Sequence, residues 1–304
     1  MTQIIDLSRL PAPDAIEALD YETLQAAFVA RFETAWAAAR LIDPSLPTWD
    51  VGALETDPAV IASQAWSYLR LLDRARVNDA VRAVLAPLAK GTDLDSVVVR
   101  IGVQRLTVTP ATDSTAAVME SDERLLMRYL LAFTRPAAGS AERYLFEAYT
   151  AWPQLLHAAV IGRAIHGRRG DTDIVIAGPG GRDATDAEMA LVRAAVTAAS
   201  VKPEATSVSV LRASRRTYAV RGRILLPPGP DAETVRLEAV ARITAAAAER
   251  MRIGAEVPSV FLSGRAYGLS VVRVDLTEPA TDIPAHPYTV SVLADVALTA
   301  EVAS

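Results

Sequence analysis

Residues 57–106 read DPAVIASQAWSYLRLLDRARVNDAVRAVLAPLAKGTDLDSVVVRIGVQRL, and this stretch decides the fold of the first third of the chain. Asp57 can accept hydrogen bonds from the first free amides of a helix, and Pro58 suits the first helical position, where an amide has no partner. No helix-breaking residue follows before Pro87. The sequence therefore predicts a helix from Pro58 to about Ala86, about 45 Å long at 1.5 Å per residue.

The apolar side chains of this helix recur every three to five residues, which is the spacing of a helix with one packing side. They are Ile61, Ala65, Leu69, Leu72, Val77, Ala80, Val84 and Leu88. Charged residues of alternating sign flank them, namely Arg70, Asp73, Arg74, Arg76, Asp79 and Arg82. One side is therefore made to pack, and the rest meets water or a polar partner. Pro87 should kink or end the helix, and Gly91 offers a left-handed C-terminal cap.

The composition excludes several classes of protein. With 304 residues the chain can hold two or three domains with apolar cores. No run approaches the roughly 18 apolar residues that span a bilayer, and MTQIIDLSRL is not a signal peptide. The absence of cysteine excludes disulfides and thiol catalysis. A net charge of −5 disfavours general nucleic-acid binding.

Two elements are predicted before the long helix. Residues 1–20 contain Pro11 and Pro13 and should form an extended arm, either a disordered tail or a segment docked on a partner or on the chain itself. Docking is favoured by the apolar residues Ile4, Ile5, Leu7 and Leu10. Asp20 should then cap a helix to about Arg40, and the loop after it should expose Trp49.

The middle of the chain combines linkers and short helices. The β-branched run 97–99 is ambiguous between helix and strand. Residues 107–120 hold Thr, Pro, Asp and Ser without period and predict a linker. Helices are predicted over 121–133 and 140–152, each capped by its first serine. Residues 134–139 form a second break between them.

After residue 153 the apolar period changes to that of strands. Strands are predicted over 155–161, 173–177, 208–211, 218–226, 271–276 and 289–298. Helices are predicted over 185–200, 232–251 and 258–267. The strand, Pro/Gly turn and Ala-rich helix of 174–199 match 223–248 by type. The match indicates two small modules side by side, which we favour, or one common supersecondary unit used twice.

The fold class is therefore α+β, in an elongated multidomain chain. An extended arm (1–20) precedes a helical, bundle-forming region (21–106), and a linker with a helical hairpin (107–153) follows it. A β-α-β module (154–226) and a β-α-α-β module (227–304) complete the chain.

No motif predicts catalysis or a cofactor. Gly178–Gly181 lies between a strand and a helix, as phosphate loops do, but no Lys-Ser/Thr pair follows it. Asp183, Asp186 and Glu188 crowd the helix start and would repel an anion, so a turn with a capped helix is predicted there. Paired carboxylates are explained by helix capping, and no G-x-S-x-G elbow occurs.

The three histidines lack the spacing of metal ligands or of a general base. His157 lies in an apolar run and is predicted to be a satisfied core or edge residue. His166 and His286 lie in turn-like contexts. The sequence thus predicts no catalytic, metal or cofactor-binding residue.

Arginines form two basic groups. Arg163, Arg168 and Arg169 make a basic turn with His166. The second group is Arg212, Arg215, Arg216, Arg221 and Arg223. If their strands are adjacent, these residues form one positive face, which is either a solvated surface or a salt-bridging interface with an acidic neighbour.

Several phrases of the sequence, in this order, resemble the baseplate assembly protein J family of contractile-tailed phages. They are Ile5–Pro13 (IDLSRLPAP), Arg76–Ala80 (RVNDA), Gly91–Asp95 (GTDLD), Gly102–Leu106 (GVQRL) and Met119–Asp122 (MESD). The resemblance covers most of the chain. It implies a virion protein of the tail baseplate, assembled in the host cytoplasm.

The resemblance implies a structural wedge component and no enzyme. In such proteins the N-terminal helices join a bundle with a second copy and a protein I-like wedge subunit. The C-terminal modules contact neighbouring wedges in a ring around the hub. A sheath-connecting baseplate subunit, and indirectly the hub and tail fibre proteins, are further implied partners, without nucleic acid or a membrane span. The implied copies differ in conformation, with candidate hinges at 107–120 and 134–139.

Partner-binding residues are predicted from the apolar stripe and the basic turn. They are Ile61, Leu69, Leu72, Val77, Val84, Arg163, Arg168 and Arg169. The alternatives are a cell-wall-active enzyme of the tail tip, which needs a clustered carboxylate or metal site, and a generic α/β interaction module.

Overall fold

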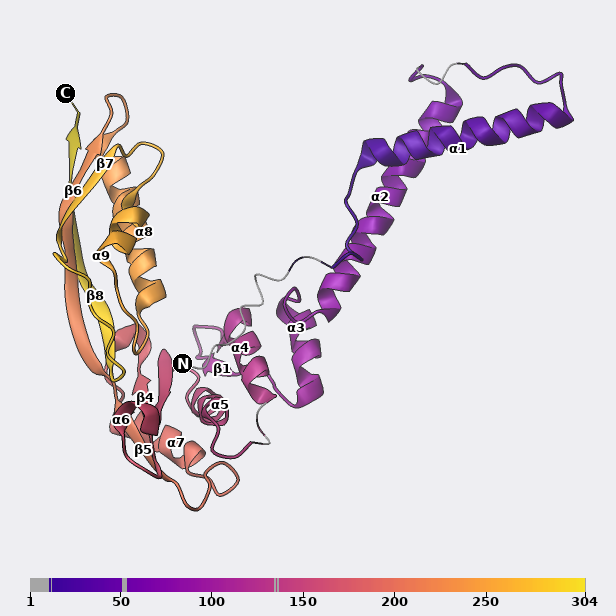
Figure 1. Ribbon diagram of the computed structural model, residues 1–304. Coiled ribbons are helices and arrows are strands. Elements are labelled where there is room, and N and C mark those ends of the chain that lie inside the picture. The colour runs from indigo at the N-terminus through magenta and orange to yellow at the C-terminus, as the bar shows by residue number, and fades with distance from the viewer. Residues whose placement is uncertain (1–10, 12, 51–53, 134, 136, 304) are drawn as a thin grey trace. The chain divides into compact units, whose positions relative to one another are not determined.

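The computed structural model describes residues 11, 13–50, 54–133, 135 and 137–303 (Figure 1). The chain divides between Gln104 and Arg105 into an N-terminal unit and a C-terminal unit. Most of the predicted arm, residues 1–10 and 12, lies outside the described residues.

The N-terminal unit is built on two long helices, α1 (Tyr21–Ile42) and α2 (Pro58–Val84), which pack against each other. The predicted starts are confirmed: Asp20 accepts hydrogen bonds from two amides of α1, and Asp57 accepts one from Ala59. α2 ends before Pro87, as the missing amide of proline requires.

The end of this unit differs from the prediction. Gly91 has a positive φ of 54° but begins the helix α3 (Gly91–Val98) instead of capping α2. The β-branched run continues α3 into the 3-10 helix η2 (Val99–Ile101), because Gly102 supplies the left-handed cap. The amide of Gly102 donates to Val99 O, and that of Val103 donates to Val98 O.

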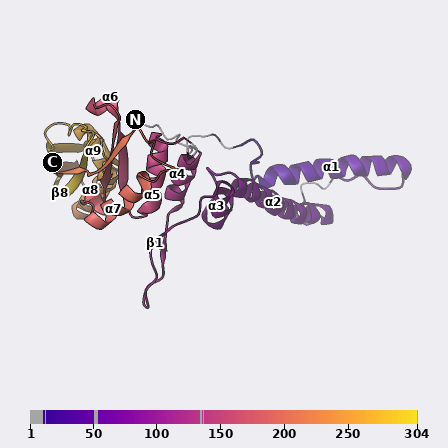
Figure 2. The ribbon, with the colours of Figure 1, turned by 90° about the horizontal axis from the view of Figure 1, so that it is seen from below.

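The C-terminal unit begins with a hairpin where a linker was predicted. β1 (Thr107–Thr109) pairs antiparallel with β2 (Val118–Met119), and Figure 2 shows this hairpin extending away from the helices that follow. The helices are α4 (Asp122–Ala132) and α5 (Ala141–Ala151). The predicted serine caps of both helices are confirmed, since each serine side chain accepts from an amide three residues later.

A first three-stranded sheet follows in the order β3-β4-β5. β3 (His157–Ile161) and β4 (Asp171–Ala177) are antiparallel and flank the one-turn helix α6 (Arg163–His166). The turn η3 (Pro179–Gly181) and the helix α7 (Asp186–Val196) cross over to β5 (Ser207–Arg212), which is parallel to β4.

A second sheet has the order β7-β6-β8. β6 (Ser214–Leu226) is parallel to β8 (Thr289–Val302) and antiparallel to β7 (Arg273–Glu278). Helices α8 (Ala232–Arg250) and α9 (Ser259–Ala266) connect β6 to β7. The strand 218–226 was predicted to belong to the first module, and this prediction was wrong, because β6 is the central strand of the second sheet.

The internal repeat is visible in the topology. Each sheet has a central strand, β4 or β6, with one parallel and one antiparallel neighbour, and a helix follows the central strand in the chain. In the first sheet α7 leads to the parallel strand β5, whereas in the second α8 and α9 lead to the antiparallel strand β7, and the parallel strand β8 follows it. The antiparallel strand comes before the central strand in the first sheet and after it in the second.

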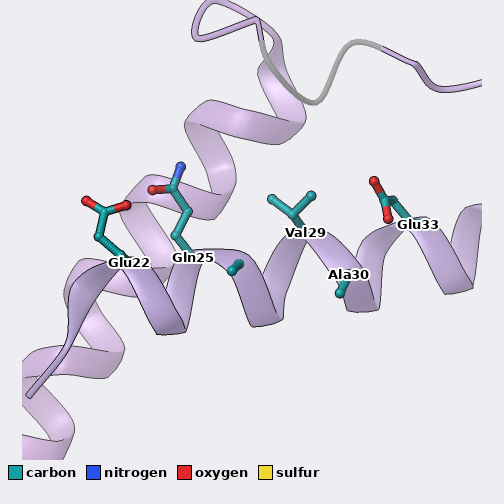
Figure 3. A pocket seen from close by; sticks show the side chains of 6 residues that line it. Glu22, Gln25, Val29, Ala30 and Glu33 are labelled. Carbon is teal, nitrogen blue, oxygen red and sulfur yellow. The ribbon is translucent and has the colours of Figure 1, made fainter. Parts of the chain in front are cut away.

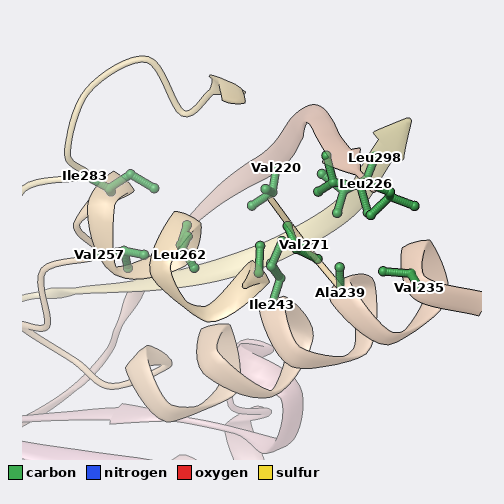
Figure 4. Close-up of a cluster of buried hydrophobic side chains, with 12 residues drawn as sticks. Val220, Leu226, Val235, Ala239, Ile243, Val257, Leu262, Val271, Ile283 and Leu298 are labelled. Carbon is green, nitrogen blue, oxygen red and sulfur yellow. The ribbon is translucent and has the colours of Figure 1, made fainter. Parts of the chain in front are cut away.

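Two apolar cores hold the sheets. Helices α8 and α9 cover one face of the second sheet. Figure 4 shows the buried side chains of this core, among them Ile243 and Leu262 from the helices and Val220 and Leu298 from the strands. A second cluster is shared between the two sheets. Its buried members are Ile161, Val175, Ala177, Ala213, Ile253, Val290 and Val292. The two modules therefore share a core.

Candidate partner-binding surfaces

The side of α2 that is buried carries small and polar side chains. Val60, Ser63, Ser67 and Asn78 are its buried residues. The Ser63 hydroxyl donates to Val60 O at 2.7 Å, and the Ser67 hydroxyl donates to Ser63 O at 2.6 Å. The hydroxyls are thus satisfied within the helix, and their small size allows another helix to lie close to α2.

The predicted stripe of α2 lies on other sides of the helix and is uncovered. Its exposed fractions run from 47% at Leu72 to 61% at Leu69. The stripe residues Ile61, Leu69, Leu72, Val77 and Val84 are all exposed. Tyr68 beside them is 57% exposed. The apolar surface predicted for packing is therefore not used against α1.

α1 also leaves most of its surface open. Leu24 is its only buried residue, and Leu41 and Ile42 at its end are each 87% exposed. An aromatic contact joins the helices nearer the start of α1, where the rings of Phe28 and Trp66 lie 5.3 Å apart. Trp49, predicted to be exposed, is half-buried, because its ring meets that of Phe32 edge-on at 4.9 Å.

A shallow depression on α1 does not have the form of a ligand site. It is lined by Glu22, Gln25, Ala26, Val29, Ala30 and Glu33. All six residues belong to one helix, and Figure 3 shows their side chains along the surface of this helix. A site that binds a small molecule needs polar groups that converge from several directions.

The arm before α1 is held by Asn78, a residue that the periodicity of the sequence did not single out. The side chain of Asn78 is buried; its Oδ1 accepts from Glu17 N at 3.0 Å, and its Nδ2 donates to Glu17 O at 2.8 Å. Arg74 adds an ion pair of 2.9 Å to the Glu17 carboxylate. The described part of the arm thus docks on the chain itself, one of the two outcomes foreseen. A buried asparagine beside a docked backbone forms a two-bond clamp.

Replacing Asn78 with alanine should release the arm at a cost of about 1–3 kcal/mol, because both clamp bonds are lost from a buried position. Hydrogen exchange should show fast exchange of the Glu17 amide. Arg74→Gln is the matched control: it removes the ion pair to a half-exposed carboxylate and should cost less than about 1 kcal/mol. Equal protection of Glu17 in both variants would contradict the clamp.

The basic turn is partly neutralised within the chain. Arg168 donates to Asp171 at 3.0 Å and to Asp173 at 2.6 Å. Asp173 is buried and also accepts from the hydroxyl of Tyr288 at 2.7 Å. Its pKa is lowered; burial opposes this shift, while Tyr288 and Arg168 drive it. Arg163 and Arg169 are exposed and have no ion-pair partner among the described residues.

The second arginine group does not form a positive face. Arg223 lies between Asp275 and Glu301 at 3.2 and 3.4 Å, and Arg221 pairs with Glu278 at 3.2 Å. Arg212 pairs with Asp186 at 2.5 Å, and Arg216 donates to Pro284 O. Of this group only Arg215 is exposed without an ion pair within the described part of the chain. The positive face that adjacent strands would form is mostly neutralised by carboxylates of β7, β8 and α7.

The motifs weighed for chemistry have structural roles. Thr185 and Glu188 form a capping box at the start of α7, as the capped-helix interpretation predicted. Arg182 pairs with Glu188 at 2.5 Å and lowers the pKa of that carboxyl to about 2. His157 Nδ1 accepts from Ile253 N, which confirms it as a satisfied residue. Within the described residues no group of three His, Asp or Glu side chains could hold a metal ion.

Comparison with known proteins gives the chain its family. The model of the Baseplate J-like N-terminal domain matches residues 55–112. Baseplate protein J of Escherichia phage P2 is 32% identical over 302 residues, which cover 92% of this chain and 92% of that protein. This chain belongs to the baseplate protein J family. Its membership supports a structural role in a phage tail baseplate.

A solved structure adds a weaker likeness. In the cryo-EM structure of the anti-feeding prophage (AFP) baseplate, 6-fold symmetrised, one chain is 14% identical with a TM-score of 0.40. The match covers 63% of this chain and 49% of that chain, and at this score it carries no weight for the fold. Among the described residues, no helix has the length and apolar character needed to cross a membrane.

Proposed function

We propose that this baseplate J protein is a wedge subunit of a contractile tail or tail-like particle. The N-terminal unit binds a second copy and a protein I-like subunit through the α2 stripe. The C-terminal unit contacts neighbouring wedges in a ring around the hub, and movement of this ring passes the trigger for sheath contraction.

One observation carries this proposal. In the described residues of α1 and α2, only Leu24 and Val60 are buried apolar side chains, although both helices are long. Most helical stability in proteins comes from packing an apolar face, so two helices with so small a shared core need further cover. The half-exposed stripe supplies a surface of the right kind, as in helical bundles.

Replacing Leu69 and Leu72 with lysine should abolish binding to the other wedge subunits and leave the isolated chain folded. Both side chains are exposed in the isolated chain, so their loss should change its stability by only about 0.5 kcal/mol each. The measurement is native mass spectrometry after co-expression with the products of neighbouring reading frames. Wild type should give a defined complex with two copies of this chain per protein I-like subunit.

The matched control is Arg70→Gln with Asp73→Asn, which changes exposed charges on α2 and leaves the apolar surface in place. This control should keep the two-to-one complex. The proposal fails if the lysine variant assembles like wild type, or if wild type remains a monomer.

The basic turn is the proposed contact between wedges. Arg168 is committed to Asp171 and Asp173, so Arg163 and Arg169 are the residues free to reach an acidic neighbour. Rim charges of this kind act mainly on association rate and register. Arg163→Glu with Arg169→Glu should therefore slow ring closure in particles without unfolding the chain.

A further inference from the structure

The outer edge of β8 is an uncovered strand edge. β8 pairs with β6 along its whole length, from Thr289 opposite Ser214 to Val302 opposite Leu226. On its other side a bridge joins Val290 to Ile253, and Thr289 O accepts from Gly254 N. Beyond this start, the described part of the chain places no strand against the outer edge of β8.

The bonds at both ends of β8 show which residues face outward. Thr289 O accepts from Gly254, so the odd residues at the start of β8 face away from β6. The register shift between Tyr218 and Ala219 leaves Ala294 without a partner residue on β6. After this bulge the odd residues of β8 face β6, and the even residues face away from it. The amide of Ala303, an odd residue, donates to Leu226 O of β6 at 2.7 Å, as this alternation requires.

Four consecutive even residues therefore direct their backbone N–H and C=O groups to the open edge. They are Val296, Leu298, Ala300 and Val302. Val296, Leu298 and Ala300 pack into the core beneath α8, so side chains hold this edge in place while its backbone groups stay unpaired.

The two edges of this sheet differ in protection. β7 is six residues long, contains Arg273, Asp275 and Glu278, and is followed by Pro279. Charges, short length and proline are the usual devices that prevent strand addition. Residues 295–302 of β8 contain no proline, lysine or glycine. The charged residues of this segment are Asp295 and Glu301, two in eight residues, against three in six for β7. The edge of β8 is therefore longer and less protected than the edge of β7.

Charge indicates the kind of strand that fits. The solvent face of β8 carries Asp295, Ala297, Thr299 and Glu301, all exposed. An antiparallel pair of two β8 strands centred on Leu298 would set Asp295 opposite Glu301, and like charges directly opposite each other are destabilising. A second β8 in this register is therefore disfavoured. Glu301 already pairs with Arg223 at 3.4 Å, so Asp295 is the carboxylate that favours a basic residue on an added strand.

We propose that the edge of β8 from Asp295 to Val302 accepts a β-strand from another baseplate subunit, and that a Lys or Arg side chain of this strand faces Asp295. Main-chain hydrogen bonds supply affinity in such strand addition, and alternate side chains supply specificity. The inference rests on the proposed baseplate function, and it identifies a surface separate from the α2 stripe.

Hydrogen exchange on the full-length chain, isolated and in purified particles, tests this inference. In the isolated chain the amides of Val296, Leu298, Ala300 and Val302 should exchange fast, and those of the odd residues between them should be protected. In particles all should be protected. Absence of the chain from particles would overturn the proposed function; its presence with the even amides still exchanging fast would overturn the strand addition alone.

A variant gives an independent readout. Ala300→Pro removes one outward N–H, and proline is tolerated where this N–H faces solvent on an edge strand. The variant should fold and lose incorporation into particles, whereas Ala300→Val, which keeps the amide, should be incorporated. Asp295→Lys tests the charge without touching the backbone, and it should reduce incorporation. Normal incorporation of both Ala300→Pro and Asp295→Lys would overturn the inference.

Discussion

Glu120→Ala should destabilise the C-terminal unit by about 3–5 kcal/mol, because it removes the carboxylate that balances the charge of the buried Arg128 guanidinium. Glu120 is 3% exposed and Arg128 is 2% exposed. The Glu120 Oε2 atom accepts from Arg128 Nη1 at 2.7 Å and from Leu106 N at 3.1 Å. The carboxylate thus ties α4 to the chain at the entrance of the β1–β2 hairpin, and one substitution breaks both links.

Fluorine NMR of fluorotryptophan-labelled protein during urea denaturation is the suitable measurement. Trp152 is buried in the C-terminal unit, while Trp36, Trp49 and Trp66 belong to the N-terminal unit. The urea concentration at which the folded Trp152 resonance has lost half its intensity should fall. The corresponding concentrations for Trp36, Trp49 and Trp66 should stay unchanged. A shift of all four resonances together would show that the two units unfold as one.

Two controls separate charge from packing. Asp122→Ala removes the ion pair between Asp122 and Arg105. The Asp122 side chain is 38% exposed, so this loss should cost about 1 kcal/mol or less. The double variant Glu120→Leu with Arg128→Met leaves no unpaired charge, so it should be less destabilising than Glu120→Ala. If the double variant loses more unfolding free energy than Glu120→Ala, the pair contributes mainly through packing and not through its charges.

The helices could be predicted because their signals are local. Asp20, Asp57, Ser121 and Ser140 cap helices within three residues of themselves, and Pro87 ends α2 through its own missing amide. The β1–β2 hairpin could not be predicted in this way. Its Thr, Pro, Asp and Ser residues have a linker composition, and the bond that holds its base joins Leu106 to the buried Glu120.

The sheets show the same limit at longer range. β6 pairs with β8 about 75 residues further along the chain, so nothing near β6 marked it as part of the second sheet. The ion pairs of the arginine rows could not be predicted for the same reason. The carboxylates opposite Arg221 and Arg223 are Glu278, Asp275 and Glu301, which lie on other strands.

The surfaces of α2 show the same difference between local and long-range signals. The exposed stripe follows from helical periodicity, since spacing alone places those residues on the surface of a helix. The buried side of Ser63, Ser67 and Asn78 resembles a polar surface when seen in the sequence. Its burial depends on the close approach of α1 and the arm. Asn78 lies within the RVNDA phrase of the family resemblance, and the clamp gives that phrase a physical role.

Acid should weaken the contact between the two sheets through His157. Burial lowers the pKa of His157 from 6.5 to about 4, and the nearby positive charges of Arg252 and Arg124 act in the same direction. Its Nδ1 accepts from Ile253 N, so the unprotonated ring connects β3 to the segment that leads to the second sheet. Above pH 6.5 the ring is neutral in both the folded and the unfolded chain. Between pH 6.5 and 4 only the unfolded chain takes up the proton, so stability falls as pH falls.

The expected loss across this window is about 3 kcal/mol, since one unit of pKa corresponds to about 1.4 kcal/mol. His157→Asn is the informative variant: its Oδ1 can accept from Ile253 N, and it does not titrate. The free energy of unfolding of each protein is measured at Trp152 from pH 7.5 to 4. The stability of wild type relative to the variant should fall by about 3 kcal/mol over this range. Carboxylates such as Glu188 titrate in both proteins and cancel in this difference. A difference that stays constant with pH would mean that His157 accepts its proton equally well in the folded chain.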